Sequence, residues 1–297
     1  MAIFIPEWVR LSGRNLHIKR VFSALDDAFV IRRPLRPERC AADFFVQHAD
    51  KGWLALAVET QAFAAIGTAQ LFDDADPRVV FEQRLAALLR LGEPAGQEQP
   101  IECLLLMWAC SEAEVRALNK QYVARFGIRM VSREQFIALG VKLIQGMLTP
   151  LSAPRQAQLM ASCFAETEVP AEATTRRFFQ RDNSATLRRW FLDVDQEGAA
   201  KADLDLPRGA ADIAGDFSVR LVNGVAGSGK TLIALNRALL LAELFPAQRV
   251  LLLIHNTPIV ADINERLRRV HGTLPQQLEI TTFFAWATRQ WRHVFGA

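Results

Sequence analysis

The residues with the clearest chemical pattern lie in the segment GVAGSGKT. Gly224, Gly229, Lys230 and Thr231 fit the pattern G-x-x-x-x-G-K-[S/T] of a phosphate-binding loop. Glycines let the backbone wrap closely around phosphates, and the loop N–H groups point at negative charge. Lys230 would reach the β- and γ-phosphates, and the Thr231 hydroxyl would hold Mg²⁺. The expected nucleotide contacts are therefore Gly224, Gly227, Ser228, Gly229, Lys230 and Thr231. The competing interpretation is a glycine turn with a lysine nearby.

The elements around this loop must present it to a nucleotide. The segment 218–223 reads as a strand, and 231–245 reads as a helix that Pro246 ends. The apolar run 249–256 predicts a buried strand, and 257–270 predicts a helix. The segment 278–287 reads as a further strand leading into a turn. The order β-α-β-α-β predicts a doubly wound parallel sheet.

A carboxylate that would hold Mg²⁺ through water is missing from this pattern. The acidic residues after Thr231 are Glu243, Asp262, Glu265 and Glu279, and none lies at the end of a predicted strand. The sequence therefore leads us to expect that the chain stops before the ATPase is complete.

The N-terminal half has a different order of elements. Strands are predicted over 28–35, 43–48, 53–60, 101–109 and 127–131, with a turn at 49–52. Helices are predicted over 79–91, 111–123 and 133–148, and the last two open with capping boxes, Ser111 with Glu114 and Ser132 with Gln135. This order predicts an α/β core.

Composition bounds the class of protein. The 297 residues suffice for two domains, and 51% hydrophobic with 23% charged residues is ordinary for a globular protein. The sequence shows neither a signal peptide nor a membrane span, and four scattered cysteines favour a reducing cytoplasm over a zinc site. Residues 217–297 carry nine Lys/Arg and four Asp/Glu, which fits a nucleic-acid track or merely solvated helix faces.

Three segments in this order, GVAGSGKT, LLLIHNTPIVADINERL and ITTFFAWA, together resemble the first helicase motifs of superfamily 1 DNA helicases, the UvrD-like group. The resemblance implies a RecA-like domain that uses ATP and Mg²⁺. FLDVDQEGAA is similar to the glutamine motif of that family, which implies that Gln196 bonds the adenine edge. The family also implies contacts to single-stranded DNA from Asn256, Thr257, Thr282 and Phe283. The second motor domain and other C-terminal helicase domains of such a protein are absent from this sequence.

The N-terminal order resembles the nuclease-related (NERD) domain of the PD-(D/E)xK superfamily, with a restriction-endonuclease-like fold. That resemblance implies that Asp43 and Glu59 hold Mg²⁺. Gln61 stands where the family usually has lysine, and it cannot carry positive charge. We therefore expect a nuclease-like scaffold with a weakened or inactive site.

The expected organisation is a nuclease-related domain at 1–150, a helical connector with the glutamine motif at 151–216, and a truncated RecA-like P-loop domain at 217–297. Arginines and aromatics alternate within 176–191, which suits either a nucleic-acid strand or an amphipathic connector. The leading hypothesis is the N-terminal part of an ATP-dependent DNA helicase. The alternatives are a nucleotide-binding regulatory or defence module that does not translocate, and a small P-loop kinase, which would leave Gln196 and Thr282 unexplained.

Overall fold

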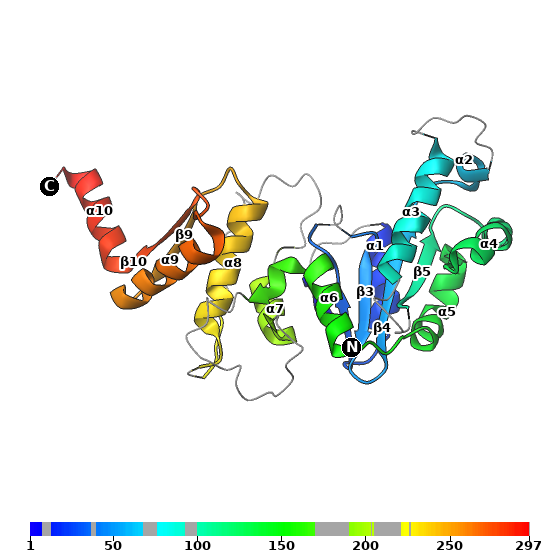
Figure 1. Cartoon of the computed structure of the whole chain (residues 1–297), viewed down its shortest axis with the longest axis horizontal. Coiled ribbons are helices and arrows are strands. Elements are labelled where there is room, and N and C mark those ends of the chain that lie inside the picture. Colours follow the sequence, from blue (N-terminus) through cyan, green and yellow to red (C-terminus); the bar gives the residue numbers. More distant parts are fainter. Residues whose placement is uncertain are drawn as a thin grey trace. The chain divides into compact units, whose positions relative to one another are not determined.

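The computed structural model describes residues 1–7, 13–36, 40–67, 76–92, 100–169, 190–202, 204, 221–225 and 227–296 (Figure 1). The chain is of the α/β class and divides into two compact units. The first unit comprises Met1–Phe164 and Ala202–Arg208, and the second comprises Ala165–Lys201 and Gly209–Ala297.

A six-stranded sheet with the order β1-β2-β3-β4-β5-β6 forms the centre of the first unit. Its strands are β1 (Ile3–Ile5), β2 (Phe29–Arg32), β3 (Phe44–His48), β4 (Gly52–Glu59), β5 (Glu102–Met107) and β6 (Arg129–Ser132). The pairs β2–β3 and β3–β4 are antiparallel, whereas β1–β2, β4–β5 and β5–β6 are parallel. Parallel neighbours place their carboxyl ends at one edge, so the end of β4 lies beside the end of β5.

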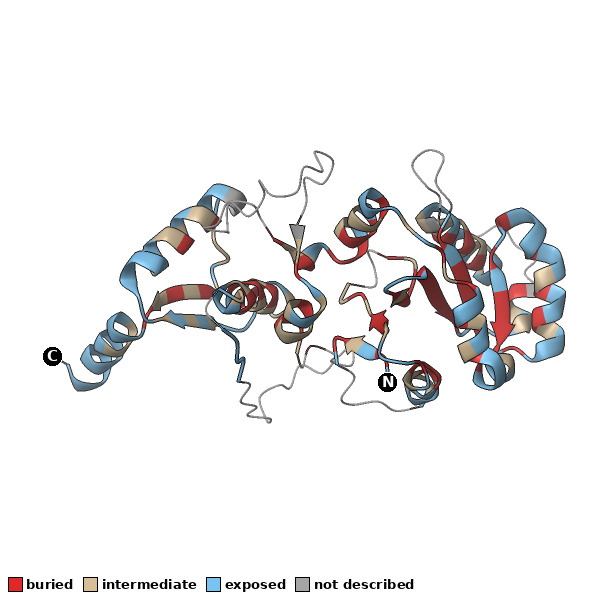
Figure 2. Cartoon of the chain, turned by 90° about the horizontal axis from the view of Figure 1, so that it is seen from below, coloured by how far each residue is buried: buried red, intermediate tan, exposed pale blue. Residues whose placement is uncertain are grey.

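Helices cover both faces of this sheet. They are α1 (Arg14–Ser23), α2 (Phe63–Gly67), α3 (Pro77–Gly92), α4 (Glu112–Phe126), α5 (Arg133–Gly146) and α6 (Ala153–Cys163). Leu54, Leu56 and Val58 of β4 belong to the core cluster that α1 and α5 complete. On β3, Phe45 turns away from that cluster and packs on Phe164 with 5.3 Å between ring centroids. All eight residues of β4 are consequently buried, and Figure 2 shows the strands of this sheet almost wholly in the buried colour.

The turn and the two helix caps that were predicted in the N-terminal half are confirmed. The turn at 49–52 joins the antiparallel strands β3 and β4. Both capping boxes form: the Ser111 hydroxyl accepts from the Glu114 N–H, and the Ser132 hydroxyl accepts from the Gln135 N–H. The three-residue strand β1 was not predicted, because so short a segment shows no periodicity.

In the second unit, two parallel strands pack against helices. The elements are a 3₁₀ turn (Ala165–Thr167), β7 (Glu168–Val169), β8 (Trp190–Phe191), α7 (Val194–Ala200), α8 (Lys230–Leu244), β9 (Val250–Ile254), α9 (Thr257–His271), β10 (Leu278–Thr282) and α10 (Phe283–Phe295). Strands β9 and β10 pair in parallel over five residues each, with α9 as the crossover. A core cluster that includes Leu235, Ala238, Leu267 and Ile280 joins α8 and α9 to this sheet.

The strand predicted at 218–223 is not found in the part of that segment that the structure describes. Residues 218–220 lie outside the described residues, and Leu221, Val222 and Asn223 form no strand. Leu221 is 82% exposed. An apolar segment becomes a strand only when another strand pairs with it, so the apolar pattern alone was insufficient.

The strand predicted at the start of 278–287 is present as β10, but a helix follows it where a turn was predicted. Strand β10 ends at Thr282, whose hydroxyl accepts a hydrogen bond from the Ala285 N–H at 3.2 Å. This N-cap turns the chain into α10 from Phe283 onward.

Residues expected to form the connector 151–216 divide between the two units. Helix α6 belongs to the first unit, whereas α7 belongs to the second. There Lys201 is buried, and its ammonium lies 2.7 Å from Glu166 and 2.8 Å from Glu197. The alternating arginines and aromatics at 176–189 lie outside the described residues. No helix in the described ranges is long and apolar enough to cross a membrane.

An added methyl group at Gly52 should destabilise the folded first unit. Its φ is +107°, and a Cβ would overlap the carbonyl group of Thr149, whose oxygen accepts from the Trp53 N–H at 2.8 Å. We expect Gly52→Ala to lower the free energy of unfolding of the first unit by about 2–4 kcal/mol. Urea unfolding followed by tryptophan fluorescence measures this. The control is Gly146→Ala at the end of α5, where a Cβ meets nothing within 4 Å. Equal stability of the two variants would contradict the expectation.

Candidate functional site

The loop before α8 places its backbone as the glycine pattern requires. Gly227 and Gly229 both have φ of +84°, a conformation that other residues rarely adopt. Helix α8 begins directly after, at Lys230, and Gly229 at its N-cap offers no side chain to bond the first N–H groups. Those N–H groups and the positive end of a 15-residue helix therefore remain available to an anion.

The ammonium group of Lys230 folds back over this loop. Its Nζ donates to the carbonyl oxygen of Gly224 at 2.7 Å and to that of Val225 at 2.8 Å. Lys230 and Thr231 are both exposed, as is Gly224. The positive charge of Lys230 is thus held at the loop while it stays accessible from solvent.

Gln196 lies against the same loop although 28 residues separate it from Gly224. Its amide nitrogen lies 3.5 Å from the Ser228 carbonyl oxygen, and a Cβ on Gly229 would come within 3.0 Å of that nitrogen. Asp193 and Gln196 form a capping box at the start of α7, in which Gln196 Oε1 accepts from the Asp193 N–H. This box was not predicted from the sequence, although D-x-x-Q is a variant of the signature that indicated the other two.

The four residues expected to contact DNA come together at one edge of the β9–β10 sheet. Ile254 pairs with Thr282, so Asn256 and Phe283 follow the carboxyl ends of neighbouring parallel strands. Asn256 is the N-cap of α9, Thr257 begins that helix, and Phe283 is 50% exposed. Thr282 is buried, and its hydroxyl is occupied in capping α10.

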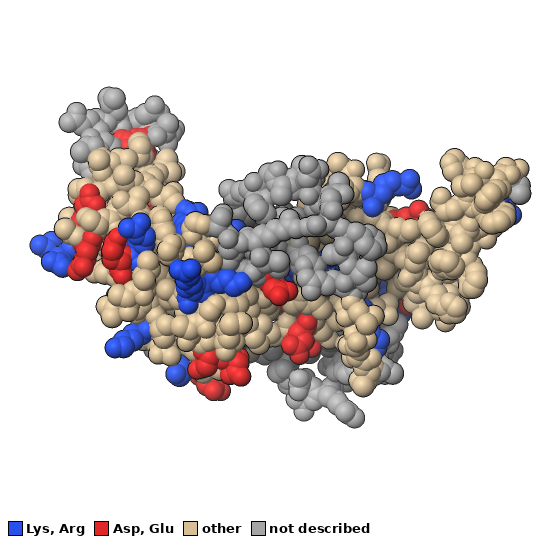
Figure 3. Space-filling view, turned by 180° about the vertical axis from the view of Figure 1, so that it is seen from behind, with Lys and Arg blue, Asp and Glu red and all other residues tan. Residues whose placement is uncertain are grey.

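Three arginines of the second unit form ion pairs with acidic residues of the same unit. Asp262 pairs with Arg266 at 2.7 Å, Glu265 pairs with Arg269, and Glu279 pairs with Arg289. Figure 3 draws one face of the whole chain, on which the described basic and acidic side chains are interspersed. The nucleic-acid and the solvated-face interpretations of the arginines in 217–297 both stay predictions.

In the first unit, Asp43 and Glu59 meet at a guanidinium group. Arg84 of α3 donates to Asp43 Oδ2 at 2.9 Å and to Glu59 Oε2 at 3.0 Å. Asp43 Oδ2 also accepts from the Val58 N–H at 2.7 Å. Glu59 is 4% exposed, and its Oε1 accepts from the N–H groups of Thr60 and Gln61 at 2.6 and 2.9 Å. The arrangement is a partly buried ion cluster in which Arg84 neutralises one of two negative charges.

These residues do not fit a divalent cation as they stand. Three of the four carboxylate oxygens already accept hydrogen bonds, and Arg84 supplies the positive charge between them. Mg²⁺ requires a near-octahedral set of oxygen ligands. The side-chain oxygen of Gln61 is buried without a hydrogen-bond partner among the described residues. Within those residues no group of three or more His, Cys, Asp or Glu could hold a metal ion.

Arg84 was not singled out from the sequence, although a signal was present. Phe81, Leu85 and Leu88 are buried on one stripe of α3, and Arg84 occupies the i+3 position of that stripe. An arginine on an otherwise apolar helix face predicts a buried carboxylate opposite it.

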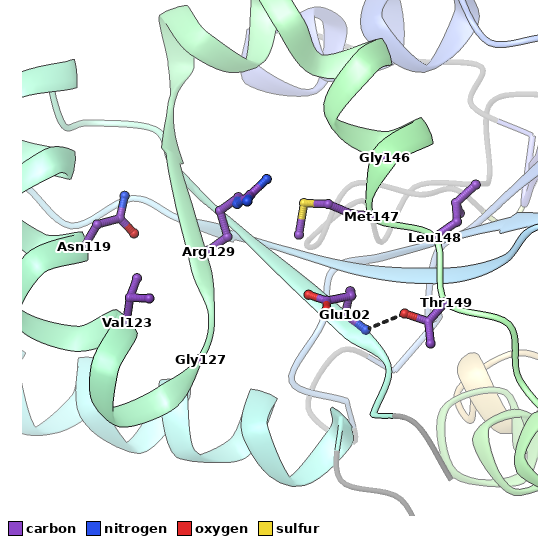
Figure 4. Close-up of a pocket in the computed structure, with 9 residues that line it drawn as sticks. All are labelled: Glu102, Asn119, Val123, Gly127, Arg129, Gly146, Met147, Leu148 and Thr149. Carbon is purple, nitrogen blue, oxygen red and sulfur yellow. Dashed lines mark hydrogen bonds between the residues drawn. The ribbon is translucent and has the colours of Figure 1, made fainter.

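A cavity of about 510 Å³ lies at the other end of the sheet (Figure 4). It adjoins Glu102 and Arg129, the first residues of β5 and β6, whereas Glu59 pairs with Met107 at the far end of β5. Asn119 exchanges two hydrogen bonds with the Met130 backbone, and the Thr149 hydroxyl accepts from the Glu102 N–H at 3.2 Å. These polar groups tie α4 to β6 and the segment after α5 to β5, so their contacts have a structural role.

Comparisons with protein-family models, with curated proteins and with solved structures find no match to this chain.

The Arg84 cluster should be coupled to the stability of the first unit. We expect Arg84→Met to lower the free energy of unfolding by about 1–3 kcal/mol, because Glu59 would stay buried without its countercharge. Adding Glu59→Gln should recover part of this loss, since the amide oxygen still accepts the two N–H groups. The control is Arg116→Met, which removes an exposed ion pair with Glu112 and should cost under about 0.5 kcal/mol. Urea denaturation that gives equal midpoints for both arginine variants would refute this role.

We also expect no Mg²⁺- or Mn²⁺-dependent cleavage of supercoiled plasmid or linear DNA by the purified chain. Gel electrophoresis over a range of metal concentrations measures this. Cleavage by the natural chain that disappears in Asp43→Ala would show that a metal displaces Arg84 and that the site is active.

Proposed function

We propose that the second unit binds ATP with Mg²⁺ through the loop Gly224–Thr231, and that the chain serves as the N-terminal part of an ATP-dependent DNA helicase or translocase. The observation that carries the proposal is the Lys230 ammonium held over Gly224 and Val225 at the uncapped start of α8. A cation, bare N–H groups and a helix dipole converge there, which is the arrangement that binds phosphate oxygens.

Binding would exchange one set of acceptors for another. The Lys230 ammonium would leave the two backbone carbonyls and donate to β- and γ-phosphate oxygens, and these charged acceptors form stronger hydrogen bonds. The Ser228 N–H would leave the Val225 carbonyl oxygen, to which it donates at 3.2 Å, and would surround the phosphates together with the N–H groups of Gly227, Gly229 and the first turn of α8. Thr231, exposed in that first turn, would hold Mg²⁺ through its hydroxyl. When bound, Mg²⁺ neutralises phosphate charge.

Gln196 supports the nucleotide assignment because of where it lies. Its amide adjoins Ser228 and Gly229, beside the loop that would hold the phosphates. An amide presents one donor and one acceptor and can pair with adenine N6 and N7. We propose that Gln196 gives up its contact with Ser228 or its capping bond with Asp193 to read this edge, which would favour ATP over other triphosphates.

The proposed binding of single-stranded DNA is supported by the residues that follow the carboxyl ends of β9 and β10. We propose that these strands with α8 and α9 form part of a RecA-like domain. Asn256 and Thr257, at the start of α9, would bind backbone phosphate, and exposed Phe283 would stack on a base. Thr282 would position Phe283 through its cap rather than bind DNA directly. The partners of such a chain are single-stranded DNA and C-terminal helicase domains.

Arg84 favours a second candidate for the role of the whole chain. A nuclease-like unit whose acidic pair is neutralised by arginine suits a regulatory or defence module that binds nucleotide without moving on DNA. The two candidates share the P-loop and differ in DNA. The motor requires single-stranded DNA at the edge that carries Asn256 and Phe283, whereas the module does not.

Removal of the Lys230 charge tests the shared step. We expect Lys230→Ala to weaken binding of a non-hydrolysable ATP analogue with Mg²⁺ by at least about tenfold, because the triphosphate loses its direct countercharge. Isothermal titration calorimetry on the purified chain measures the dissociation constant.

The matched control is Lys120→Ala, an exposed lysine of α4 in the first unit, which should bind as the natural chain does. An equal loss in both variants would mean that overall charge, and not the loop, determines affinity. Absence of binding by the natural chain would overturn the proposed function.

A further inference from the structure

Two cysteines far apart in the sequence meet in the first unit. Cys40 lies just before β3, and Cys163 is the last residue of α6. They are separated by 123 positions, yet their sulfurs are 2.8 Å apart, and both residues are buried. Neither takes part in the Arg84 cluster or in the P-loop.

The other two cysteines have different surroundings. The Cys103 thiol lies 3.6 Å from the Leu88 carbonyl oxygen, and the Cys110 thiol lies 3.7 Å from that of Gln61. Burial raises the pKa of Cys103 to about 12 and that of Cys110 to about 11. These two thiols have backbone acceptors and serve as internal references for the pair.

We propose that Cys40 and Cys163 are a disulfide-forming pair, a covalent site that closes when the chain meets a peroxide. A disulfide has its sulfurs about 2.0 Å apart, so the two atoms need to approach by only about 0.8 Å from their present separation. A cavity of about 480 Å³ opens beside them and is lined by both cysteines together with Arg90, Arg155 and Ser162. A molecule as small as hydrogen peroxide can enter such a space.

The reaction proceeds in two balanced steps. One thiol attacks hydrogen peroxide, gives a sulfenic acid and releases one water. The second thiol then attacks that sulfenic sulfur, the S–S bond forms, and the hydroxyl group leaves as a second water. The two thiols together lose two protons and two electrons, and the peroxide accepts them.

The same contact makes the reaction slow at neutral pH. The hydrogen bond with Cys163, and then burial, raise the pKa of Cys40 far above that of an ordinary thiol. The nucleophile is the thiolate, so oxidation should proceed over minutes to hours and accelerate at higher pH. The site is therefore suited to sustained oxidative conditions rather than to rapid peroxide sensing.

Closure would fasten α6 to the segment that enters β3. Phe164 and Phe45 already pack together at this place, so the cross-link joins elements that are in contact in the native fold. A link across so long a loop restricts the unfolded chain, and the midpoint of thermal unfolding of the first unit should rise by about 5 °C or more.

Peptide mapping of the full chain tests the proposal. The native protein is treated with hydrogen peroxide, quenched, denatured in the presence of N-ethylmaleimide, digested and analysed by mass spectrometry. We expect a linked peptide pair that contains Cys40 and Cys163 and is two hydrogens lighter than the two peptides, with maleimide on Cys103 and Cys110. Cys110→Ser should keep the link, and Cys40→Ser should leave Cys163 alkylated. The rise in unfolding midpoint should occur in the natural chain, reverse with a phosphine reductant and be absent in Cys163→Ser.

Full alkylation of Cys40 and Cys163 after treatment would overturn the proposal. Links that join them to Cys103 or Cys110 would do the same. A Cys40–Cys163 link that lowers the unfolding midpoint would also overturn it, because the bond would then have formed outside the native fold.

Discussion

Burial of the central strand β4 on both faces is the constraint on which the first unit depends. Every residue from Gly52 to Glu59 is buried, so charge is tolerated only where the strand ends. Glu59 stands at that end and would be costly there without a partner. Arg84 of α3 is that partner, and it forms a second ion pair with Asp43. The guanidinium that neutralises the acidic pair thus also occupies carboxylate oxygens that a metal ion would need.

The loop that precedes α8 in the second unit differs from this cluster in how its charge is placed. Gly224, Lys230 and Thr231 are exposed, and the positive charge at this loop comes from N–H groups, a helix terminus and one lysine rather than from buried ion pairs. No folding requirement forces Lys230 to face Gly224 and Val225, since an exposed ammonium is well solvated by water. A charge that is held at a loop without stabilising a core is available for a ligand, and this contrast is why we place the proposed activity in the second unit.

Sequence analysis predicted local features well and distant contacts poorly. The turn between β3 and β4 and the Ser111 and Ser132 helix caps were predictable, because each depends on residues a few positions apart. The helix starting at Phe283 was missed because a single threonine hydroxyl decides it. Asp43 and Glu59 were singled out as predicted metal ligands, and the structure brings them together at Arg84. Arg84 itself was not singled out, since its contacts depend on α3 crossing the strand ends. Nothing in the spacing of Cys40 and Cys163 indicates that they meet.

The central claim is that the loop Gly224–Thr231 receives the phosphates of a nucleotide. Hydrogen–deuterium exchange with and without a saturating non-hydrolysable ATP analogue and Mg²⁺ tests it at the backbone groups themselves. The account predicts slower exchange in peptides that cover residues 224–233, with a smaller effect around Gln196, and no such change in Lys230→Ala. Unchanged exchange in that loop, or protection confined to other parts of the chain, would contradict it.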